Sequence, residues 1–479
     1  MPQSFEEIFS ELKEKLKVED IEFVDFKVVD PEGRWRHLTI PRSKFTREFL
    51  ESGLGFDGSS YGYSRVEDSD LLLVPDLSTA RLEPAEEEQV LSLVGDIFRV
   101  SGSSEKERFT HDPRGTSKRA AKYLQESGIA DEFRISPEYE FYVFDSARFY
   151  YGDNVGAFSL SSPEQPDRGP KGEGSSHPLP KSGGYHAPRP GDSIAKLRNR
   201  ITSFLESQGV SVKYHHHELG GAGESEIEVD FTNLPEVADE TLFIKHAVRT
   251  IAASVGKSAT FMPKPLNDFP GNGMHLHHYL RKNGENLFAG EKYGGLSQLA
   301  LYFLGGLIEH GKSLSGITNP TTNSYRRLIS GHEAPVDLVF GGANRSAAIR
   351  IPGYVESKEK KRVELRTVDA TCNPYLAYSA VLMAGIDGIE KQIDPIDRDY
   401  GPMEQNIYEL QEDRKEGIKS VPNSLASALE ALEKDHAYLL KGEVFRETQI
   451  KNWLRLKRKE KNSLEDKPHP FEHVLYYDL

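Results

Sequence analysis

The stretch from His215 to Asp230 is the feature that most constrains how this chain folds. It reads His-His-His-Glu-Leu-Gly-Gly-Ala-Gly-Glu-Ser-Glu-Ile-Glu-Val-Asp. From Glu224 onward, acids alternate with other residues, and because strand side chains alternate between two faces, these acids are predicted to share one face. Like charges on one face repel one another, and a divalent cation, which prefers carboxylate oxygens, would relieve the repulsion. A solvated acidic edge strand is the alternative, and this stretch alone does not decide between them.

The bulk properties of the chain narrow the classes of protein to consider. With 479 residues and a mass of 53.8 kDa, the chain is long enough for two domains. A net charge of −15 argues against a nucleic-acid partner, which requires a basic face. The single cysteine, Cys372, excludes an intrachain disulfide and favours a reducing compartment, so we expect a cytoplasmic protein. We find no signal-peptide pattern and no apolar run long enough to span a bilayer, so no membrane partner is expected.

Periodicity and turn residues divide the chain into two predicted domains, 1–105 and 106–479. Ser4 and Glu7 fit a capping box for a first helix, and strand-like segments follow at 21–29, 35–40, 71–74 and 90–100. Asp112 and Pro113 begin a helix after a polar linker. Residues 151–191 are rich in Gly, Pro and Ser and are predicted to form a surface excursion with little regular structure. Helical patterns cover 192–208, 236–255, 295–315, 374–392 and 424–440.

Two further stretches place polar side chains on one strand face. Glu138 and Glu140 alternate with aromatic residues, so both acids would point one way while the aromatics pack behind them. This pattern favours metal ligation over solvent exposure. His275 and His277 follow a glycine-bearing loop at the same spacing, which favours a site over two satisfied polar core residues.

The remaining charged motif is rich in arginine. Arg345, Arg350, Arg362 and Arg366 surround Glu364, and guanidinium groups match carboxylate and phosphate geometry with two parallel hydrogen bonds. A structural ion-pair ladder around Glu364 is the alternative. The run 306–313 matches a phosphate-loop pattern letter for letter, but apolar residues at helical spacing lead straight into it. A phosphate loop must follow a strand, so this match is rejected.

Taken together, the acids and one histidine predict a two-cation site for Mg²⁺ or Mn²⁺, since oxygen-rich ligand sets suit these ions. The arginines beside it point to metal-dependent phosphoryl transfer from a nucleotide to an anionic acceptor. The residues that carry this prediction are Glu138, Glu140, Glu218, Glu226, Glu364, His275, Arg345, Arg350, Arg362 and Arg366.

Several motifs in order along the chain resemble those of type I glutamine synthetases. They lie at residues 56–60, 137–141, 183–185, 215–226, 259–265, 319–325, 344–350 and 373–375. The resemblance covers nearly the whole chain and implies an α+β fold. It has a small β-grasp-like N-terminal domain and a large catalytic domain with a curved antiparallel sheet and surrounding helices. It also implies ATP-dependent ligation of ammonia to L-glutamate through γ-glutamyl phosphate, in a homododecamer of two hexameric rings with shared active sites.

The resemblance further implies a role for each site residue. Glu140, Glu218 and Glu226 would hold one metal ion, and Glu138, His275 and Glu364 the other. Arg327, Arg366 and Gly271 would bind glutamate, Arg345 and Arg350 the transferring phosphate, and Arg362 and His277 would lie nearer ATP. Asp57 of a neighbouring subunit would bind ammonium and take its proton, near Ser60, Tyr185 and Glu218. Glu333 would lie on a flap that excludes water from the acyl phosphate.

The chain departs from the family pattern at a few positions. Tyr279 replaces the serine that usually ends the nucleotide signature, Pro270 replaces an asparagine, and Glu224 replaces a glutamine. These positions belong to the nucleotide pocket and the glutamate loop. A γ-glutamyl ligase that acts on another amine therefore remains an alternative, as does a non-catalytic scaffold or regulatory relative. Tyr408 occupies the position at which some relatives are adenylylated.

Overall fold

The N-terminal part of the chain forms a small mixed sheet with two short helices. The computed structural model describes residues 4–64, 69–84, 88–100, 106–165, 177–329, 334–407 and 417–477. The helices here are α1 (Phe5–Val18) and α2 (Arg47–Ser52), with 3₁₀ turns η1 (Arg42–Lys44) and η3 (Leu77–Thr79). The strands are β1 (Phe23–Val29), β2 (Trp35–Pro41), β3 (Leu54–Asp57), β4 (Asp70–Pro75), β5 (Arg81–Leu82), β6 (Val90–Val100) and β7 (Lys106–Arg108).

This sheet runs in the order β2-β1-β6-β4-β3, and β5 and β7 also pair with β6. β1 and β6 are parallel, whereas β1 and β2 form the predicted antiparallel hairpin. The capping box of Ser4 and Glu7 is confirmed, and Leu12 and Leu16 of α1 join the core beneath the sheet. β7 begins just after the predicted boundary at residue 105 and still pairs with β6, so the boundary itself stays a prediction.

The rest of the chain forms the larger domain. Its strands are β8 (Glu132–Phe144), β9 (Ser146–Gly152), β10 (Val155–Ser161), β11 (Val212–His217), β12 (Glu224–Val229), β13 (Thr232–Asn233), β14 (Ser258–Thr260), β15 (Leu276–Lys282), β16 (Glu285–Asn286), β17 (Asp337–Gly342), β18 (Ala347–Ile351) and β19 (Val363–Leu365). Its helices are α3 (Pro113–Glu126), α4 (Ala195–Ser207), α5 (Glu236–Ser254), α6 (Gln298–Glu309), α7 (Gly311–Thr318), α8 (Ser324–Arg327), α9 (Pro374–Glu390), α11 (Leu425–Lys434), α12 (Glu447–Glu465) and α13 (Pro470–Tyr476). Short 3₁₀ segments are η4 (Tyr293–Gly295), η5 (Lys358–Lys360) and η7 (Ala437–Glu443).

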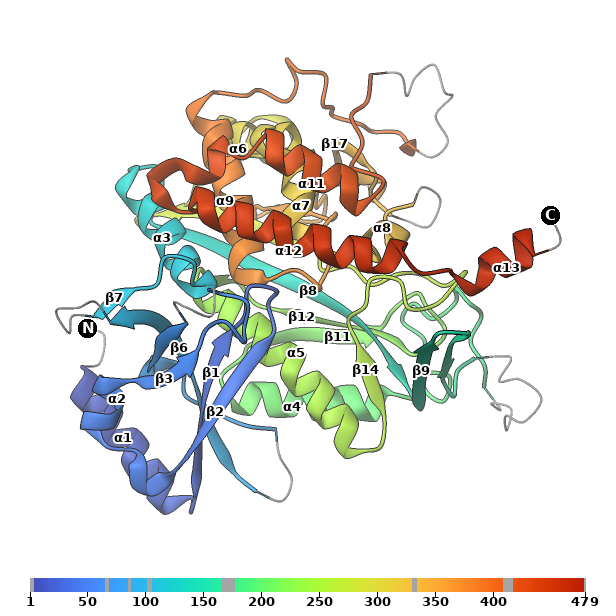
Figure 1. Cartoon of the computed structure of the whole chain (residues 1–479). Helices are drawn as coiled ribbons and strands as arrows, with labels where there is room; N and C mark the ends of the chain where they lie inside the picture. The colour runs from blue at the N-terminus through green and yellow to red at the C-terminus, as the bar shows by residue number, and fades with distance from the viewer. Residues whose placement is uncertain are drawn as a thin grey trace.

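The large sheet runs in the order β11-β12-β8-β15-β19-β18-β17. All neighbours along this path are antiparallel except β17 and β18, which are parallel. β8 pairs with β15 through residues 132–137 and with β12 through residues 138–142, so the two halves of the sheet meet at Glu138. In Figure 1, α6, α7, α9 and α11 lie above β8, and α4 and α5 lie below β11 and β12. This is the α+β architecture that the resemblance implies.

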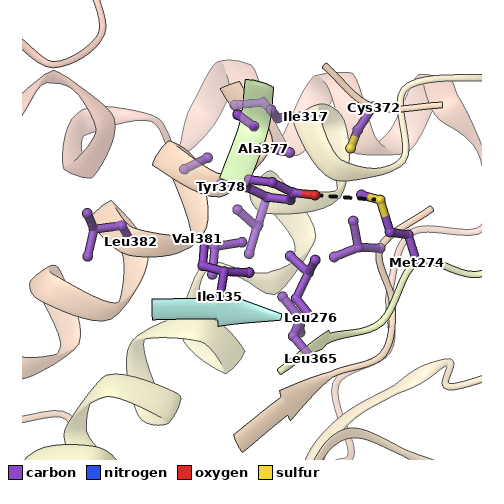
Figure 2. Packing of buried hydrophobic residues seen from close by; sticks show 14 of the residues in the cluster. Ile135, Met274, Leu276, Ile317, Leu365, Cys372, Ala377, Tyr378, Val381 and Leu382 are labelled. Atoms are coloured by element: carbon purple, nitrogen blue, oxygen red, sulfur yellow. Dashed lines mark hydrogen bonds between the residues drawn. The ribbon is translucent and has the colours of Figure 1, made fainter. Parts of the chain in front are cut away.

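One face of the large sheet is apolar and packs on the helices. Figure 2 shows Ile135, Leu276 and Leu365, from three neighbouring strands, beside Tyr378 of α9. The Tyr378 hydroxyl donates to Met274 Sδ at 3.6 Å, and every one of these side chains is almost completely buried. Because strand side chains alternate, the residues between these core positions must point to the opposite face.

The helix predicted at 295–315 is two helices, α6 and α7, which meet at His310. The rejected phosphate-loop match lies across this junction with no strand before it, as predicted. Its glycines serve helix packing, because a Cβ on Gly306 would lie 2.1 Å from the Ala384 carbonyl oxygen of α9. The pattern at 424–440 likewise divides into α11 and η7.

The prediction for residues 151–191 is wrong at its N-terminal end. β9 and β10 form an antiparallel hairpin that pairs Ser146 with Ser161. Its outward side chains are aromatic, with Phe149 85% and Phe158 62% exposed. The Gly and Ser residues in this segment favoured a loop prediction, although β9 and β10 pair with each other.

The two domains are joined through a buried arginine. Arg114, at the start of α3, donates to Asp96 and Asp76 of the N-terminal domain at 2.9 Å each. It also donates to both carboxylate oxygens of Asp239 on α5, the shorter contact being 2.9 Å. The side chain of Arg114 is only 3% exposed, so the contact belongs to the interior of the molecule.

The C-terminal α13 lies at the edge of the molecule in Figure 1, beyond the long α12. Large apolar and aromatic side chains are exposed along it and at the next residue: Phe471, Val474, Leu475, Tyr476 and Tyr477. Across the described ranges, no helix is both long and apolar enough to cross a bilayer.

Candidate active site

The face of the large sheet opposite the core carries the predicted acidic residues. Glu140 lies opposite Glu226 in the β8–β12 register, and His277 lies opposite Glu364 in the β15–β19 register. β12 lies between β11 and β8 and is buried along its whole length, so the alternative of a solvated edge strand is wrong. Asp230 differs from the other acids because it lies beyond the strand end, is exposed, and accepts from Ser211 Oγ at 2.6 Å.

One predicted metal triad is brought together. Glu138, His275 and Glu364 are buried and offer ligand atoms that all lie within 4.8 Å of one another. His275 Nδ1 lies 2.9 Å from Glu138 Oε2 and 3.8 Å from Glu364 Oε1. Glu364 in turn forms ion pairs with Arg350 and Arg366. Three donors at these separations can hold a divalent cation.

The second triad is arranged differently from the prediction. Glu218 and Glu226 form a ligand cluster with His216, whose Nε2 lies 3.4 Å from Glu226 Oε1. Glu140, the predicted third ligand, lies opposite Glu226 and 3.6 Å from His275 Nε2, between the two clusters. Sequence reasoning gave His216 no role, although it alternates with Glu218 in the same stretch.

A further group of ligands lies beside the first triad. Glu228 and His277 share a cluster with Glu138, and His277 Nε2 lies 2.7 Å from Glu138 Oε1. Sequence reasoning placed Glu228 on the acidic face but gave it no role. Its signal was the same alternation of period two.

Buried carboxylates lie close together in these clusters, and their pKa values are shifted accordingly. Burial and the neighbouring carboxylate of Glu140 raise the pKa of Glu218 to about 9. Burial and Glu138 raise the pKa of Glu226 well above its ordinary range. Burial opposes charge on Glu138 as well, but His277 and His275 hold its pKa well below the ordinary range. A divalent cation would favour the charged form of all these groups, so the donor set fits Mg²⁺ or Mn²⁺.

A small cavity of about 60 Å³ opens beside these clusters. Gly271 forms part of its wall, where a Cβ would lie 2.5 Å from the Pro263 carbonyl oxygen and 3.1 Å from Arg327 Cγ. Arg327 is buried and donates to the carbonyl oxygens of Thr367 at 3.1 Å and Arg366 at 3.2 Å. The polar side chains around the cavity belong to Glu140, Glu218, Glu224, Lys264, His275, Arg327, Arg345 and Arg366.

Two members of this wall were not assigned to the site from the sequence. Lys264 belongs to the motif at residues 259–265 but was given no role, and Glu224 was named only as a departure from the family pattern. Glu224 is buried, its Oε2 accepts from Gly220 N at 2.6 Å, and its Oε1 has no hydrogen-bond partner in the described part of the chain. A carboxylate with one free oxygen therefore lines the cavity.

The four predicted arginines differ in how many ion pairs and hydrogen bonds they form with other residues. Arg345 is exposed at the small cavity and has no ion pair among the described residues. Arg350 and Arg366 both contact Glu364, and each has a buried Nε–H that no described residue pairs with. Arg362 donates to His277 Nδ1 at 3.3 Å. Unpaired N–H groups of this kind can bind the oxygens of an anion.

Of the residues predicted to bind ammonium, Tyr185 lies beside His216, whereas Asp57 lies in the N-terminal domain. Tyr185 is 47% exposed, stacks on His186 with ring centroids 4.0 Å apart, and meets His216 edge-on at 5.4 Å. Asp57 ends β3 in the N-terminal domain and is not among the residues that line the small cavity. Its carboxylate accepts from Ser60 Oγ and Ser59, which lowers its pKa to about 2. Glu333 and Tyr408 lie outside the described residues.

Comparison with known proteins identifies the family. Residues 110–476 match the family described as glutamine synthetase, catalytic domain, and residues 20–100 match the glutamine synthetase β-grasp domain. Glutamine synthetases of Aquifex aeolicus and Pseudomonas aeruginosa are each 43% identical to this chain, over 98% and 97% of it and 98% of their own lengths. A 3-hydroxylaminophenol mutase of Cupriavidus pinatubonensis is 41% identical over the full length of both chains.

Solved structures agree with this. Plasmodium falciparum glutamine synthetase superimposes with a TM-score of 0.86 at 28% identity over 98% of both chains. Apo GmaS superimposes with a TM-score of 0.80 at 28% identity, over 98% of this chain and 99% of its own. Both the β-grasp domain and the catalytic fold expected from the sequence are thereby confirmed. The chain is an enzyme of the glutamine synthetase family.

Proposed function

We propose that this protein ligates ammonia to L-glutamate with ATP, through a γ-glutamyl phosphate intermediate. The observation that carries the proposal is a single sheet face on which acidic clusters, unpaired arginine N–H groups and a small cavity meet. Acids for cations, arginines for phosphate and a small charged cavity for an amino acid are the parts that such a reaction needs.

In this proposal, Glu140, Glu218 and Glu226 hold one Mg²⁺ or Mn²⁺ ion, and Glu138, His275 and Glu364 hold the other. When bound, the ions neutralise phosphate oxygens of ATP. His216 lies close enough to Glu218 and Glu226 to join the first set, and His277 fixes Glu138 from the opposite side. The ligands are held in place by hydrogen bonds and burial, so little reorganisation is needed when the cations bind.

Arg327 and Arg366 orient glutamate in the small cavity by pairing with its carboxylates, and Gly271 leaves the room that it needs. An oxygen of the side-chain carboxylate attacks the γ-phosphorus, and ADP leaves with the bonding electron pair. Arg345 and Arg350 bind the transferring phosphoryl group, and Arg362 and His277 lie on the side where ATP binds.

Ammonia nitrogen then attacks the acyl carbon, and inorganic phosphate leaves. Asp57, with Ser60 holding its carboxylate, binds ammonium and receives its proton beside Tyr185 and Glu218. The low pKa of Asp57, caused by hydrogen bonds from Ser60 and Ser59, keeps the carboxylate charged and therefore attractive to a cation.

We also propose that Asp57 serves the site of a neighbouring subunit in a homododecamer of two hexameric rings. Asp57 does not line the small cavity of its own chain, which supports a shared site. The aromatic residues exposed on β9–β10 and the apolar residues on α13 support self-association, because exposed apolar patches mark interaction surfaces.

An amine other than ammonia is the second candidate acceptor. The free carboxylate oxygen of Glu224 in the cavity favours it, because a glutamine is usual there and a carboxylate would pair with a cationic amine.

The test is phosphate release from ATP with glutamate and Mg²⁺ or Mn²⁺, with and without ammonium, while glutamine is followed. We expect stoichiometric phosphate and glutamine only when glutamate and ammonium are both present. The E364A variant should be inactive, whereas D230N, a change in an exposed acid just outside the site, should retain activity. Glutamate-dependent release without glutamine would establish another amine as acceptor, and no release would establish a non-catalytic relative.

A further inference from the structure

A second and larger cavity, of about 650 Å³, lies between the two domains and is separate from the small cavity. The N-terminal domain contributes the β1–β2 turn, residues 32–35. The large domain contributes α5 and the loops 260–263, 321–323 and 370–371, and α12 contributes Lys457 and Glu460. A volume of this size suits a small organic ligand.

Two cations in the cavity wall form no ion pair with a described carboxylate. Lys245 and Arg249 are four residues apart on α5 and so lie on one helix face. Both charges lie over the Phe261 ring, at 5.9 and 5.3 Å from its centroid. The Lys245 ammonium donates to the Ala370 carbonyl oxygen, and Arg249 has no hydrogen bond or ion pair within the described part of the chain.

The other cations around the cavity already have acidic partners. Lys457 Nζ lies 2.5 Å from Glu460 Oε2 and 3.4 Å from Glu32 Oε1. His246 Nε2 lies 2.5 Å from Glu83 Oε2. Lys245 and Arg249 are therefore the cations in this wall whose charge no described carboxylate neutralises. Burial lowers the pKa of Lys245 to about 8, which a bound anion would reverse.

Trp35 adds a further hydrogen-bond donor to the same wall. Its indole Nε1–H is buried and has no hydrogen-bond partner among the described residues. Buried donors are almost always paired, by protein, water or ligand.

The loops between the two cavities link them by hydrogen bonds. Asn323 donates to the Lys264 carbonyl oxygen at 3.0 Å and accepts from Lys264 N at 2.7 Å. Asn323 lines the large cavity and directly precedes α8, which carries Arg327, whereas Lys264 and Arg327 line the small one. Met262, in the wall of the large cavity, accepts from Asn272 Nδ2 at 2.8 Å, and Asn272 follows Gly271. A ligand in the large cavity would therefore contact Asn323 and Met262, which are hydrogen-bonded to residues at or next to the wall of the small cavity.

We propose that the large cavity is a second binding site, in which Lys245 and Arg249 hold a small carboxylate- or phosphate-bearing metabolite whose binding changes the affinity for glutamate. The shared chemistry of the two ligand classes is an oxyanion that accepts hydrogen bonds from both cations.

Trp35 provides a local readout, because the chain has only two tryptophans and the other, Trp453, is outside this cavity's wall. In the W453F variant, fluorescence reports Trp35 alone. Succinate and inorganic phosphate are titrated separately, each against sodium chloride of equal ionic strength. We expect a saturable change with at least one of them, and the one that binds more tightly identifies the ligand class.

The decisive variant is R249Q in the W453F background, since within the described part of the chain the Arg249 guanidinium contacts only the Phe261 ring and forms no hydrogen bond or ion pair. We expect binding at least about tenfold weaker, in line with the loss of charge-assisted hydrogen bonds. R398Q, a change in an exposed arginine outside the cavity, is the matched control and should bind as tightly as W453F. No saturable change, or a response of equal affinity in R249Q, would overturn the proposed site.

The effect on glutamate is measured separately. The anion that binds at Trp35 should change the KM for glutamate in the wild type by at least about twofold, with less change in R249Q. An equal change of the KM for glutamate in the wild type and in R249Q would overturn the proposed coupling, because the anion would then act at the small cavity and not at Arg249. Binding at Trp35 does not require turnover, so it stands or falls independently of the proposed ligase reaction.

Discussion

Replacement of Arg114 by methionine is expected to destabilise the protein more than almost any other single change at the domain interface. The guanidinium is 3% exposed and contacts three aspartates, two from the N-terminal domain and Asp239 from α5. Burial opposes its charge, but Asp239 and Asp96 raise the pKa of Arg114 well above its ordinary range. Methionine keeps the length of the side chain and removes every one of these hydrogen bonds.

The expected loss of unfolding free energy in R114M depends on which partners the three aspartates keep. Lys118 Nζ still lies 2.8 Å from Asp96 and 3.5 Å from Asp76, so these two aspartates keep a cation. Asp239 keeps only neutral donors such as the Tyr375 hydroxyl. Loss of one partner from a buried ion pair costs about 3–5 kcal/mol, and we expect a loss in this range for R114M. The second substitution D239N should recover about 1–3 kcal/mol, because it removes the uncompensated buried charge.

Urea unfolding followed by circular dichroism measures these differences. R108M is the matched control, because Arg108 also contacts Asp96, at 2.9 Å, but its side chain is 39% exposed. An exposed ion pair contributes no more than about 1 kcal/mol. The reasoning would be refuted if R114M unfolded at the same urea concentration as R108M, or if D239N destabilised R114M further.

Other predictions concern the site and one buried histidine. Mn²⁺ should raise the thermal unfolding midpoint of the wild type and of D230N but raise that of E226Q much less, and scanning calorimetry would show equal shifts in all three if Glu226 were no ligand. D57A should lower kcat/KM for ammonium by about 100-fold or more. Mixed oligomers of D57A and E364A should regain activity if sites are shared, whereas mixing inactive proteins without recovery would contradict a shared site. Burial opposes the charge on His310, yet two aspartates raise its pKa above 6.5. The histidine therefore stabilises the protein most below pH 6.5, and the stability difference between wild type and H310Q, measured in urea, should shrink as pH rises through the folded-state pKa. A difference that grows with pH would refute this assignment.

Much of the site could be predicted because its signals are local. Alternation with a period of two is a property of any single strand, so Glu138 and Glu140 could be assigned to one face before their neighbours were known. Helical spacing likewise excluded the phosphate-loop match, since Gly306 lies inside α6. The ordered motifs then predicted the family, which the comparisons confirm.

The structure was needed wherever the partner of a residue lies far away in the sequence. His216 joins Glu226 only because β11 pairs with β12, and Glu138 meets His275 and Glu364 only because β8 joins both halves of the sheet. The hairpin β9–β10 was missed because its strands are Gly- and Ser-bearing and pair only with each other.

The sequence by itself thus determined which side chains share a face, because that depends on the geometry of one strand or helix. Only the tertiary structure decided which faces meet. The large cavity illustrates this, because its cations on α5 and its indole on β2 come from different domains, more than 200 positions apart in the sequence. Long-range packing, which no local pattern encodes, brings Lys245, Arg249 and Trp35 to one wall.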